Sequence, residues 1–143
     1  MVQLNHPNRF TVLLANEQEG WHQTVRGLLE PQGVQTVVAR GGRDALDIIE
    51  HRPVHLAVLD AKMPGLGGLQ VVRMMRERGV QAPGQMPLPP AILVADDMTD
   101  YLLREALSMH VFSVLSKPVD FNLLLDAMAR AMRRFYESRW PGE

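Results

Sequence analysis

Five short apolar segments recur at fairly regular intervals along the chain, and each has the length of a β-strand. They are apolar nearly throughout, without the alternation of apolar and polar residues that marks a half-exposed strand. Such segments are typical of parallel strands that are buried on both faces of a sheet. The segments span residues 10–14, 34–39, 56–59, 91–95 and 111–115.

The sequence between these segments has helical spacing. The first intervening stretch places apolar residues at i, i+4, i+7 and i+8, namely Trp21, Val25, Leu28 and Leu29. The last stretch continues this spacing from Phe121 to Phe135, and Asp120 is placed to cap its start. Strands that alternate five times with helices predict an α/β fold with three layers, a (βα)5 arrangement around a five-stranded parallel sheet with right-handed crossovers.

One connection is longer than the others and rich in proline. Residues 79–90, GVQAPGQMPLPP, contain four of the ten prolines of the chain. Two interpretations stay open: a surface extension of the connection, or a polyproline ligand in which Pro87 and Pro90 form a PxxP pair. Because this segment leads into the amino-terminal end of the fourth strand, it lies away from the edge at which open α/β sheets bind ligands.

Length and composition restrict the function classes. With 143 residues the chain has the size of one domain, and its net charge of -1 gives no global attraction to nucleic acid or to anionic lipid. The absence of cysteine excludes a disulfide framework, a thiolate metal site and a cysteine nucleophile. The apolar segments are far shorter than the about twenty residues of a membrane span, and the start of the chain lacks the apolar centre of a signal peptide. We therefore expect a cytoplasmic protein without a membrane segment and without direct contact to nucleic acid.

Polar residues follow the carboxyl ends of the strands, where open α/β sheets bind their ligands. Asn16 and Glu17 follow the first strand, Asp60 ends the third, and Lys117 follows the fifth. The carboxylate and amide oxygens are hard ligands of the kind that Mg²⁺ requires. A lysine beside them could neutralise a phosphoryl oxygen. The combination suggests a carboxylate that accepts a phosphoryl group.

Two motifs at these positions resemble the receiver domains of two-component response regulators, which have a CheY-like, flavodoxin-like fold. The first is VLDAKMPGLGG, residues 58–68, which is similar to the segment that carries the family's phosphoacceptor aspartate. The second is LSKP, residues 115–118, which is similar to the family's lysine followed by proline, a pair that is usually joined by a cis bond. The resemblance covers about residues 9–138, and it leaves residues 1–8 and 139–143 as tails.

The resemblance implies a role for each residue of this site. Asp60 corresponds to the phosphoacceptor, and Lys117 to the lysine that stabilises the phosphoryl group. Mg²⁺ is expected on Glu17, Asp60 and the backbone carbonyl of Lys62, with Asn16 bound through water. The implied partners are a sensor histidine kinase or a phosphotransfer protein, and the implied output is contact with a downstream protein, not an enzymatic reaction. Because few residues follow the last helix, no effector domain is expected within this chain.

The family also suggests which face transmits the signal. Receivers commonly contact other proteins through the face formed by the fourth helix, the fifth strand and the fifth helix. On the last helix, Arg130, Arg133 and Arg134 form a basic strip at i, i+3 and i+4. Two interpretations stay open: a solvated helix face, or a surface for a protein partner, including a second copy of the chain in a homodimer.

Four positions depart from the family's pattern. The acidic pair after the first strand is Asn16-Glu17, which is expected to weaken Mg²⁺ binding. The threonine or serine at the end of the fourth strand is Ala95, so its hydroxyl contact to a phosphoryl group is missing, and the small residue after it is Asp96. The aromatic residue of the fifth strand is Val114.

These departures leave two functions open. The first is a receiver that is phosphorylated on Asp60, and the second is a pseudo-receiver that keeps the fold and binds its partner without phosphorylation. Asp96 and Asp97 could also serve only as the start of the fourth helix. A flavin-binding protein is disfavoured, because the first strand-to-helix turn lacks the glycine-, serine- or threonine-rich cradle that holds a phosphate.

Overall fold

The computed structural model describes residues 10–77 and 88–136. Within them, five parallel strands form one sheet in the order β2-β1-β3-β4-β5. The strands are β1 Thr11–Ala15, β2 Gln35–Ala39, β3 Leu56–Asp60, β4 Ala91–Ala95 and β5 Ser113–Ser116. The predicted α/β fold around a five-stranded parallel sheet is confirmed. Only the ends of the strands differ from the predicted segments, by one or two residues.

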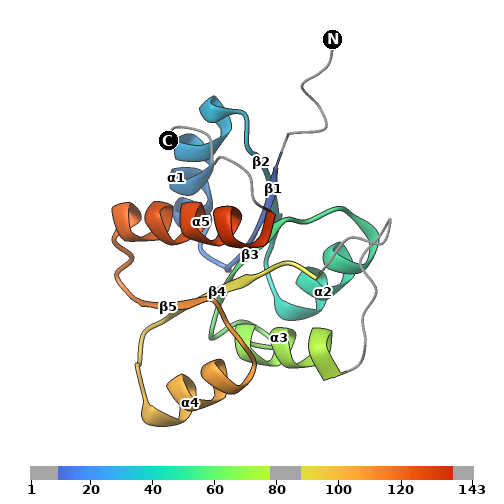
Figure 1. The fold of residues 1–143 in the computed structure, drawn as a ribbon, viewed down its shortest axis with the longest axis vertical. Coiled ribbons are helices and arrows are strands. Elements are labelled where there is room, and N and C mark those ends of the chain that lie inside the picture. Colours follow the sequence, from blue (N-terminus) through green and yellow to red (C-terminus); the bar gives the residue numbers. More distant parts are fainter. Residues whose placement is uncertain (1–9, 78–87, 137–143) are drawn as a thin grey trace.

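In the part of the chain that the structure describes, five α-helices alternate with the strands, as the helical spacing predicts. They are α1 Glu19–Leu29, α2 Gly42–His51, α3 Gly68–Glu77, α4 Asp100–Ser108 and α5 Phe121–Tyr136. Helices α1 and α5 cover one face of the sheet, and α2, α3 and α4 cover the other face, which gives the three predicted layers (Figure 1). In the ranges 10–77 and 88–136, no helix has both the length and the apolar character to cross a membrane.

Two apolar clusters fill the space between the sheet and its two helix layers. Met128 and Met132 on α5 are fully buried in the cluster beneath α1 and α5, where they serve as core residues. Val25 and Leu29 of α1 are buried in the same cluster. Leu28 belongs to the predicted apolar stripe but is 37% exposed. It stands on the neighbouring row of the helix surface, since successive residues turn by about 100°.

The helix ends follow local sequence signals. Oδ1 of Asp120 accepts hydrogen bonds from the backbone N–H groups of Asn122 at 2.9 Å and Leu123 at 3.3 Å, so the predicted cap of α5 is confirmed. Helix α1 passes into a short 3-10 turn, η2 Glu30–Gln32, and Gly33 then reverses the chain with a φ of 88°. That left-handed conformation favours glycine.

The proline-rich connection is described only in part. Pro87 lies outside the described residues, whereas Pro90 is buried directly before β4. The carbonyl of Pro90 accepts a hydrogen bond from the backbone N–H of Ala57 at 3.0 Å, so this residue belongs to the start of the sheet. A buried Pro90 does not offer its ring to a partner, which disfavours the PxxP interpretation.

Candidate functional site

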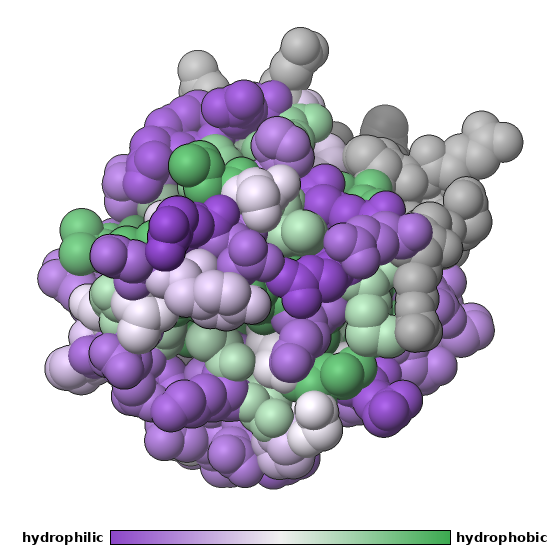
Figure 2. All heavy atoms as spheres, turned by 90° about the horizontal axis from the view of Figure 1, so that it is seen from below, coloured by the Kyte–Doolittle hydropathy of each residue, from purple (hydrophilic) through white to green (hydrophobic). Residues whose placement is uncertain are grey.

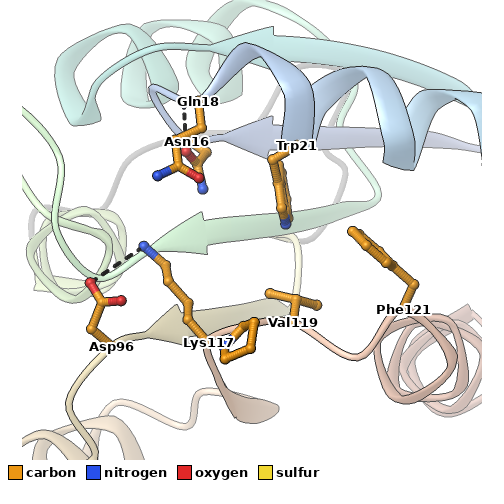
Figure 3. A pocket seen from close by; sticks show the side chains of 8 residues that line it. Asn16, Gln18, Trp21, Asp96, Lys117, Val119 and Phe121 are labelled. Carbon is orange, nitrogen blue, oxygen red and sulfur yellow. Dashed lines mark hydrogen bonds and ion pairs between the residues drawn. The ribbon is translucent and has the colours of Figure 1, made fainter.

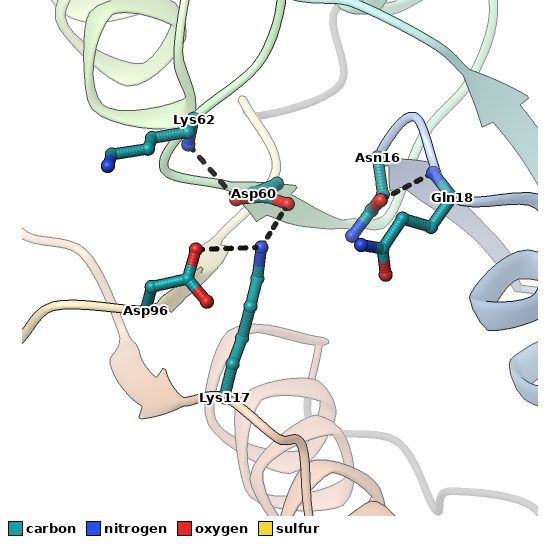
Figure 4. A network of polar contacts seen from close by, with 6 residues as sticks. All are labelled: Asn16, Gln18, Asp60, Lys62, Asp96 and Lys117. Carbon is teal, nitrogen blue, oxygen red and sulfur yellow. Dashed lines mark hydrogen bonds and ion pairs between the residues drawn. The ribbon is translucent and has the colours of Figure 1, made fainter.

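Asp60 occupies the middle of the carboxyl edge of the sheet, because it ends β3, the central strand. Its side chain is 4% exposed. Oδ1 accepts a hydrogen bond from the backbone N–H of Lys62 at 3.0 Å, and Oδ2 accepts one from the ammonium of Lys117 at 2.6 Å (Figure 4). A buried carboxylate requires such partners to offset its lost hydration. The structure thus brings the predicted acceptor and the predicted lysine into direct contact.

Lys117 follows β5, which pairs with β4 at the edge of the sheet. Its backbone N–H donates to the carbonyl of Ala95 at 2.9 Å, and its bond to Pro118 is cis, as the resemblance implies. The ammonium also lies 3.8 Å from Oδ2 of Asp96, a side chain that is 62% exposed. One cation therefore stands between a buried carboxylate and an exposed one (Figure 4).

The glycine pair after β3 lets α3 begin directly beside Asp60. A Cβ atom on Gly68 would lie 2.7 Å from the backbone oxygen of Asp60, and one on Gly67 would lie 2.1 Å from the backbone oxygen of Ala61. These distances are too short for any side chain, so only glycine fits at both positions. The second half of the VLDAKMPGLGG motif thus has a steric role in placing the acceptor.

Asn16 follows β1, the strand beside β3, and is 1% exposed. Its backbone N–H donates to the carbonyl of Ala39 at 3.0 Å, and its Oδ1 accepts from the backbone N–H of Gln18 at 2.7 Å. Asn16, Asp60 and Lys117 therefore meet at one edge of the sheet, as the sequence predicts (Figure 4). Glu17, the other predicted metal ligand, is exposed.

The residues around Asp60 offer oxygen donors but little negative charge. The described residues contain no group of three or more acidic or histidine side chains that could hold a metal ion. The oxygen donors that the structure places at this edge are the carboxylate of Asp60 and the amide of Asn16, which fit the oxygen preference of Mg²⁺, while the backbone carbonyl of Lys62 stays a predicted ligand. Because Lys117 already pairs with Asp60, this set suits an ion that keeps most of its water ligands.

The positions that depart from the family's pattern also lie near this site. Ala95 ends β4 and is 2% exposed, and Val114 of β5 packs against the cluster beneath α2, α3 and α4. A hydroxyl-bearing residue and an aromatic residue are thus replaced by two aliphatic ones. The start of α4 is capped by Thr99, whose Oγ1 accepts from the backbone N–H of Leu102 at 3.0 Å. Asp96 and Asp97 are therefore not needed as caps of that helix.

A cavity of about 440 Å³ lies beside Lys117, between α1 and the segment that leads from β5 into α5 (Figure 3). Trp21 of α1 and Phe121 of α5 contribute aromatic walls, while Asn16, Asp96 and Lys117 contribute polar groups. In the sequence, Trp21 fits the apolar stripe of α1, and it does pack partly against the core. Spacing alone gives no signal that such a residue also lines a cavity.

Comparison with known sequences reveals the relatives of this chain. The family described as the response regulator receiver domain matches residues 12–129. The chain is 28% identical over 118 residues to the sensory/regulatory protein RpfC of Xanthomonas campestris pv. campestris, which covers 82% of this chain and 16% of RpfC. It is 30% identical over 132 residues to the response regulator MprA of Mycolicibacterium vanbaalenii, which covers 92% of this chain and 54% of MprA. The chain thus spans about half, or less, of the length of these curated relatives.

Comparison with solved structures agrees with the sequence relatives. The signal receiver domain of an HD domain-containing protein from Pseudomonas fluorescens Pf-5 superimposes with a TM-score of 0.78 and 25% identity, over 92% of this chain and 100% of that one. The predicted CheY-like, flavodoxin-like fold is confirmed. Since the family matches most of the chain and the strand order and fold agree, this chain belongs to the response regulator receiver domains, the signalling modules of two-component systems.

Proposed function

We propose that this receiver domain accepts a phosphoryl group on Asp60 from a histidine kinase or a phosphotransfer protein. The observation that carries the proposal is the contact between Asp60 and Lys117, which pairs a 4% exposed carboxylate with an ammonium 2.6 Å away at the ligand-binding edge of the sheet. In the transfer, the bond between the donor nitrogen and phosphorus breaks, and a bond between a carboxylate oxygen of Asp60 and phosphorus forms.

The two contacts of Asp60 have separate roles in this proposal. The backbone N–H of Lys62 holds Oδ1 at 3.0 Å and fixes the orientation of the carboxylate. The ammonium of Lys117 leaves the carboxylate as the phosphoryl group arrives and neutralises the phosphoryl oxygens instead. The charge of the lysine is thus already within the site before the transfer, so no cation has to be brought in from solvent.

Mg²⁺ is the cofactor that we propose for this site. The residues that would hold it are Glu17, Asp60 and Lys62 through its backbone carbonyl, with Asn16 acting through water. When bound, the ion supplies positive charge to the transferring oxygens. Because the amide of Asn16 is uncharged, the affinity for Mg²⁺ is expected to be lower than at a site with a full acidic pair.

A phosphorylation-independent pseudo-receiver is the second candidate function. Asp96 favours it, since its carboxylate lies 3.8 Å from the ammonium of Lys117 and adds negative charge where a phosphoryl dianion would have to enter. Ala95 and Val114 favour it as well, because they remove the hydroxyl and the aromatic ring that link phosphorylation to a conformational change in the family. In this case the fold alone would present the partner surface.

Incubation with phosphoramidate and Mg²⁺, followed by intact mass measurement, separates the two candidates. Phosphoramidate has a phosphorus–nitrogen bond, as the proposed donor does. A receiver gains one phosphoryl adduct that is absent from the Asp60→Asn variant, while Asp97→Asn serves as a control of equal charge change. Failure of the parent chain to gain an adduct would overturn the proposed phosphorylation and leave the pseudo-receiver.

We propose that the signal leaves through the face formed by α4, β5 and α5. Large apolar side chains are exposed on these helices: Tyr101, Leu103, Leu107, Leu123 and Phe135. The guanidinium of Arg130 lies 5.7 Å from the ring centre of Phe112, so part of the basic strip covers an aromatic surface. Seen from the end of the molecule at which α4 lies, hydrophobic patches are small and separated by polar residues (Figure 2). Such a mixed surface suits a transient protein contact, including that of a homodimer.

The receiver unit is proposed to extend over residues 9–138, slightly beyond the matched residues. Phe10 is buried before β1, and the hydroxyl of Tyr136 at the end of α5 donates to the carbonyl of His55 at 2.7 Å. Both ends of the described fold are therefore attached to its core. Residues 1–8 and 139–143 lie outside the described residues and stay predicted as tails.

We also propose a cytoplasmic location for this chain, and this proposal rests on its family alone.

A further inference from the structure

A groove lies at the opposite end of β5 from Lys117. Strand β5 is at the edge of the sheet, with α4 on one side and α5 on the other (Figure 1). The groove has a volume of about 490 Å³, and it is lined by the end of α4, the residues that lead into β5 and the second half of α5. Neither Asp60 nor Lys117 is among its lining residues, so phosphoryl transfer leaves the groove without a role.

The charged side chains that line this groove are two arginines. Arg130 and Arg134 lie about one turn apart on α5, and no aspartate or glutamate is among the lining residues. Nε of Arg130 donates to Asp126 at 2.9 Å, but the arginine side chain stays 50% exposed. Within residues 10–77 and 88–136, no carboxylate forms an ion pair with Arg134. The groove therefore presents accessible positive charge to an anionic group.

Aromatic rings support both guanidinium groups. The guanidinium of Arg130 lies 5.7 Å from the ring centre of Phe112, and that of Arg134 lies 5.6 Å from the ring centre of Phe135. The two rings contact each other edge to face, with their centres 6.1 Å apart. A guanidinium that stacks on a ring keeps its donors available in its own plane, and it has less conformational freedom to lose when it binds a carboxylate.

The groove also exposes apolar surface beside these charges. Leu107 near the end of α4 is 77% exposed, and Phe135 is 48% exposed. Both side chains line the groove. A small inorganic anion would leave this surface in water, and a purely apolar ligand would desolvate the arginines without pairing them. The lining thus favours an occupant that brings carboxylates and an apolar side chain together.

We propose that this groove binds an acidic segment of a partner protein, in which a leucine or phenylalanine is flanked by aspartate or glutamate. The carboxylates pair with Arg130 and Arg134, and the apolar side chain packs on Leu107 and Phe135. Nucleic acid is disfavoured, because the chain has a net charge of -1. The proposal rests on the proposed output face of α4, β5 and α5, whose partner it specifies, but it does not require phosphorylation of Asp60.

Titration of the isotope-labelled chain with the capped peptide DDLFDD, followed in amide NMR spectra, tests the proposal. The backbone signals of Phe112, Arg134 and Phe135 should move in a saturable manner, with a dissociation constant below about 1 mM. The peptides SSLFSS and DDSSDD lack either the charges or the apolar side chains, so each should bind at least about tenfold more weakly. Equal affinities for DDLFDD and the oppositely charged KKLFKK, or shifts that do not saturate, would overturn the proposal.

Two variants of exposed residues locate the binding site. Arg134→Gln removes one guanidinium, and Leu107→Ser removes the apolar contact from α4. Each should weaken the binding of DDLFDD about fivefold or more, and Arg134→Gln should also reduce its sensitivity to salt. Arg43→Gln makes the same charge change at an exposed position of α2, in the other helix layer from α5, and should leave the affinity unchanged. Unchanged affinity in Arg134→Gln or in Leu107→Ser would contradict the proposed site.

Two further measurements separate this groove from the other proposals. The Asp60→Asn variant should bind DDLFDD as tightly as the parent chain, so peptide binding by a chain that gains no phosphoryl adduct would support the groove and overturn only the phosphorylation. A parent chain that gains the adduct but does not bind DDLFDD would overturn only the groove. Dilution of the protein without peptide should leave the signals of Phe112 and Arg134 unmoved. Movement on dilution would identify a second copy of the chain as the occupant and overturn the acidic partner.

Discussion

The ammonium of Lys117 lies 2.6 Å from Oδ2 of Asp60, so the proposed acceptor carries a counter-charge before any phosphoryl group arrives. The two residues depend on each other unequally. Asp60 is 4% exposed, and within residues 10–77 and 88–136 its one further hydrogen-bond partner is the backbone N–H of Lys62. Lys117 is 18% exposed and also lies near Asp96. Loss of the lysine should therefore be more harmful than loss of the carboxylate.

Lys117→Gln should lower the free energy of unfolding by about 2–4 kcal/mol, because it leaves the buried carboxylate of Asp60 without its counter-charge. Asp60→Asn should change it by less than about 1 kcal/mol, since Lys117 keeps access to Asp96 and to water. Urea unfolding at pH 7 measures both values. The double variant should regain most of the stability that Lys117→Gln loses. Equal losses in the two single variants would show that the pair is not asymmetric.

Asp96→Ala should accelerate the formation of the phosphoryl adduct on Asp60. The substitution removes a carboxylate beside Lys117, and one charge a few ångströms away in a hydrated site contributes about 1 kcal/mol, or roughly fivefold in rate. The rate of adduct formation from phosphoramidate, followed by intact mass, gives the measurement. Asp97→Ala removes the same charge from the next residue and should have a smaller effect, and high salt should diminish the difference. Identical rates in the two variants would show that the ion pair of Asp96 has no influence.

Most of the fold could be predicted from the sequence because the three inner strands, β1, β3 and β4, are fully buried and therefore almost entirely apolar. The edge strands β2 and β5 are only partly buried, but they keep apolar residues at their centres. The position of Asp60, Asn16 and Lys117 at one edge follows from the same pattern, since all parallel strands end on the same side of the sheet. Knowing the strands and their direction is enough to place these three residues together.

The finer properties of the site depend on side-chain directions that no spacing encodes. Oδ1 of Asn16 accepts a hydrogen bond from the backbone N–H of Gln18 because of the conformation of the turn after β1, which the residue spacing does not predict. Trp21 has a double role because the apolar cluster that it packs against and the cavity that it lines both include residues of α5, which is distant in sequence. The start of α4 is capped by Thr99 and not by an aspartate. Several polar residues precede this helix and each could cap it, so the sequence alone does not identify the capping residue.

Gly68→Ala should destabilise the fold and disturb the acceptor. The new Cβ atom would lie 2.7 Å from the backbone oxygen of Asp60 and 2.9 Å from Cδ2 of Leu93, and a backbone oxygen cannot move away as a side chain can. We expect a loss of about 2–3 kcal/mol in urea unfolding. Gly27→Ala in α1 is the matched control: nothing lies within 4 Å of its new Cβ atom, so it should stabilise the protein by about 0.5–1 kcal/mol. Changes of the same sign would contradict the close packing at Gly68.

His22 should make the protein less stable in weak acid. Burial lowers the pKa of His22 below its ordinary value of 6.5, since its side chain is 1% exposed and its charged form loses hydration. The unfolded chain therefore binds a proton as the pH falls below 6.5, while the folded chain does not. The stability that His22 contributes is complete above this pH and is lost progressively below it. Below pH 6.5, the free energy of unfolding should therefore fall less steeply with falling pH in His22→Phe than in the parent. The two slopes should differ by at most about 1.4 kcal/mol per pH unit.

Urea unfolding of the parent and the variant between pH 7.5 and pH 5 gives this slope. His51 is the control, because its side chain is exposed and its hydrogen bond to the carbonyl of Asp47 raises its pKa. The His51→Gln variant should still lose the stability that the parent loses through His22 below pH 6.5. Parallel curves for the parent and His22→Phe would assign the pH dependence to other groups.

Asn16→Asp should tighten Mg²⁺ binding at the carboxyl edge of the sheet. The new carboxylate can still accept the hydrogen bond from Gln18, which is 2.7 Å long, and it adds a charged ligand beside Asp60 at a 1% exposed position. Without Mg²⁺, the second buried carboxylate should lower the midpoint of thermal unfolding by several degrees. With saturating Mg²⁺, the midpoint should rise by more than in the parent, in line with an affinity about tenfold higher. Glu17→Gln should reduce the effect of Mg²⁺ if Glu17 turns inward to the ion, and Asp60→Asn should abolish it. A midpoint of Asn16→Asp that is the same with and without Mg²⁺ would exclude this edge as the metal site.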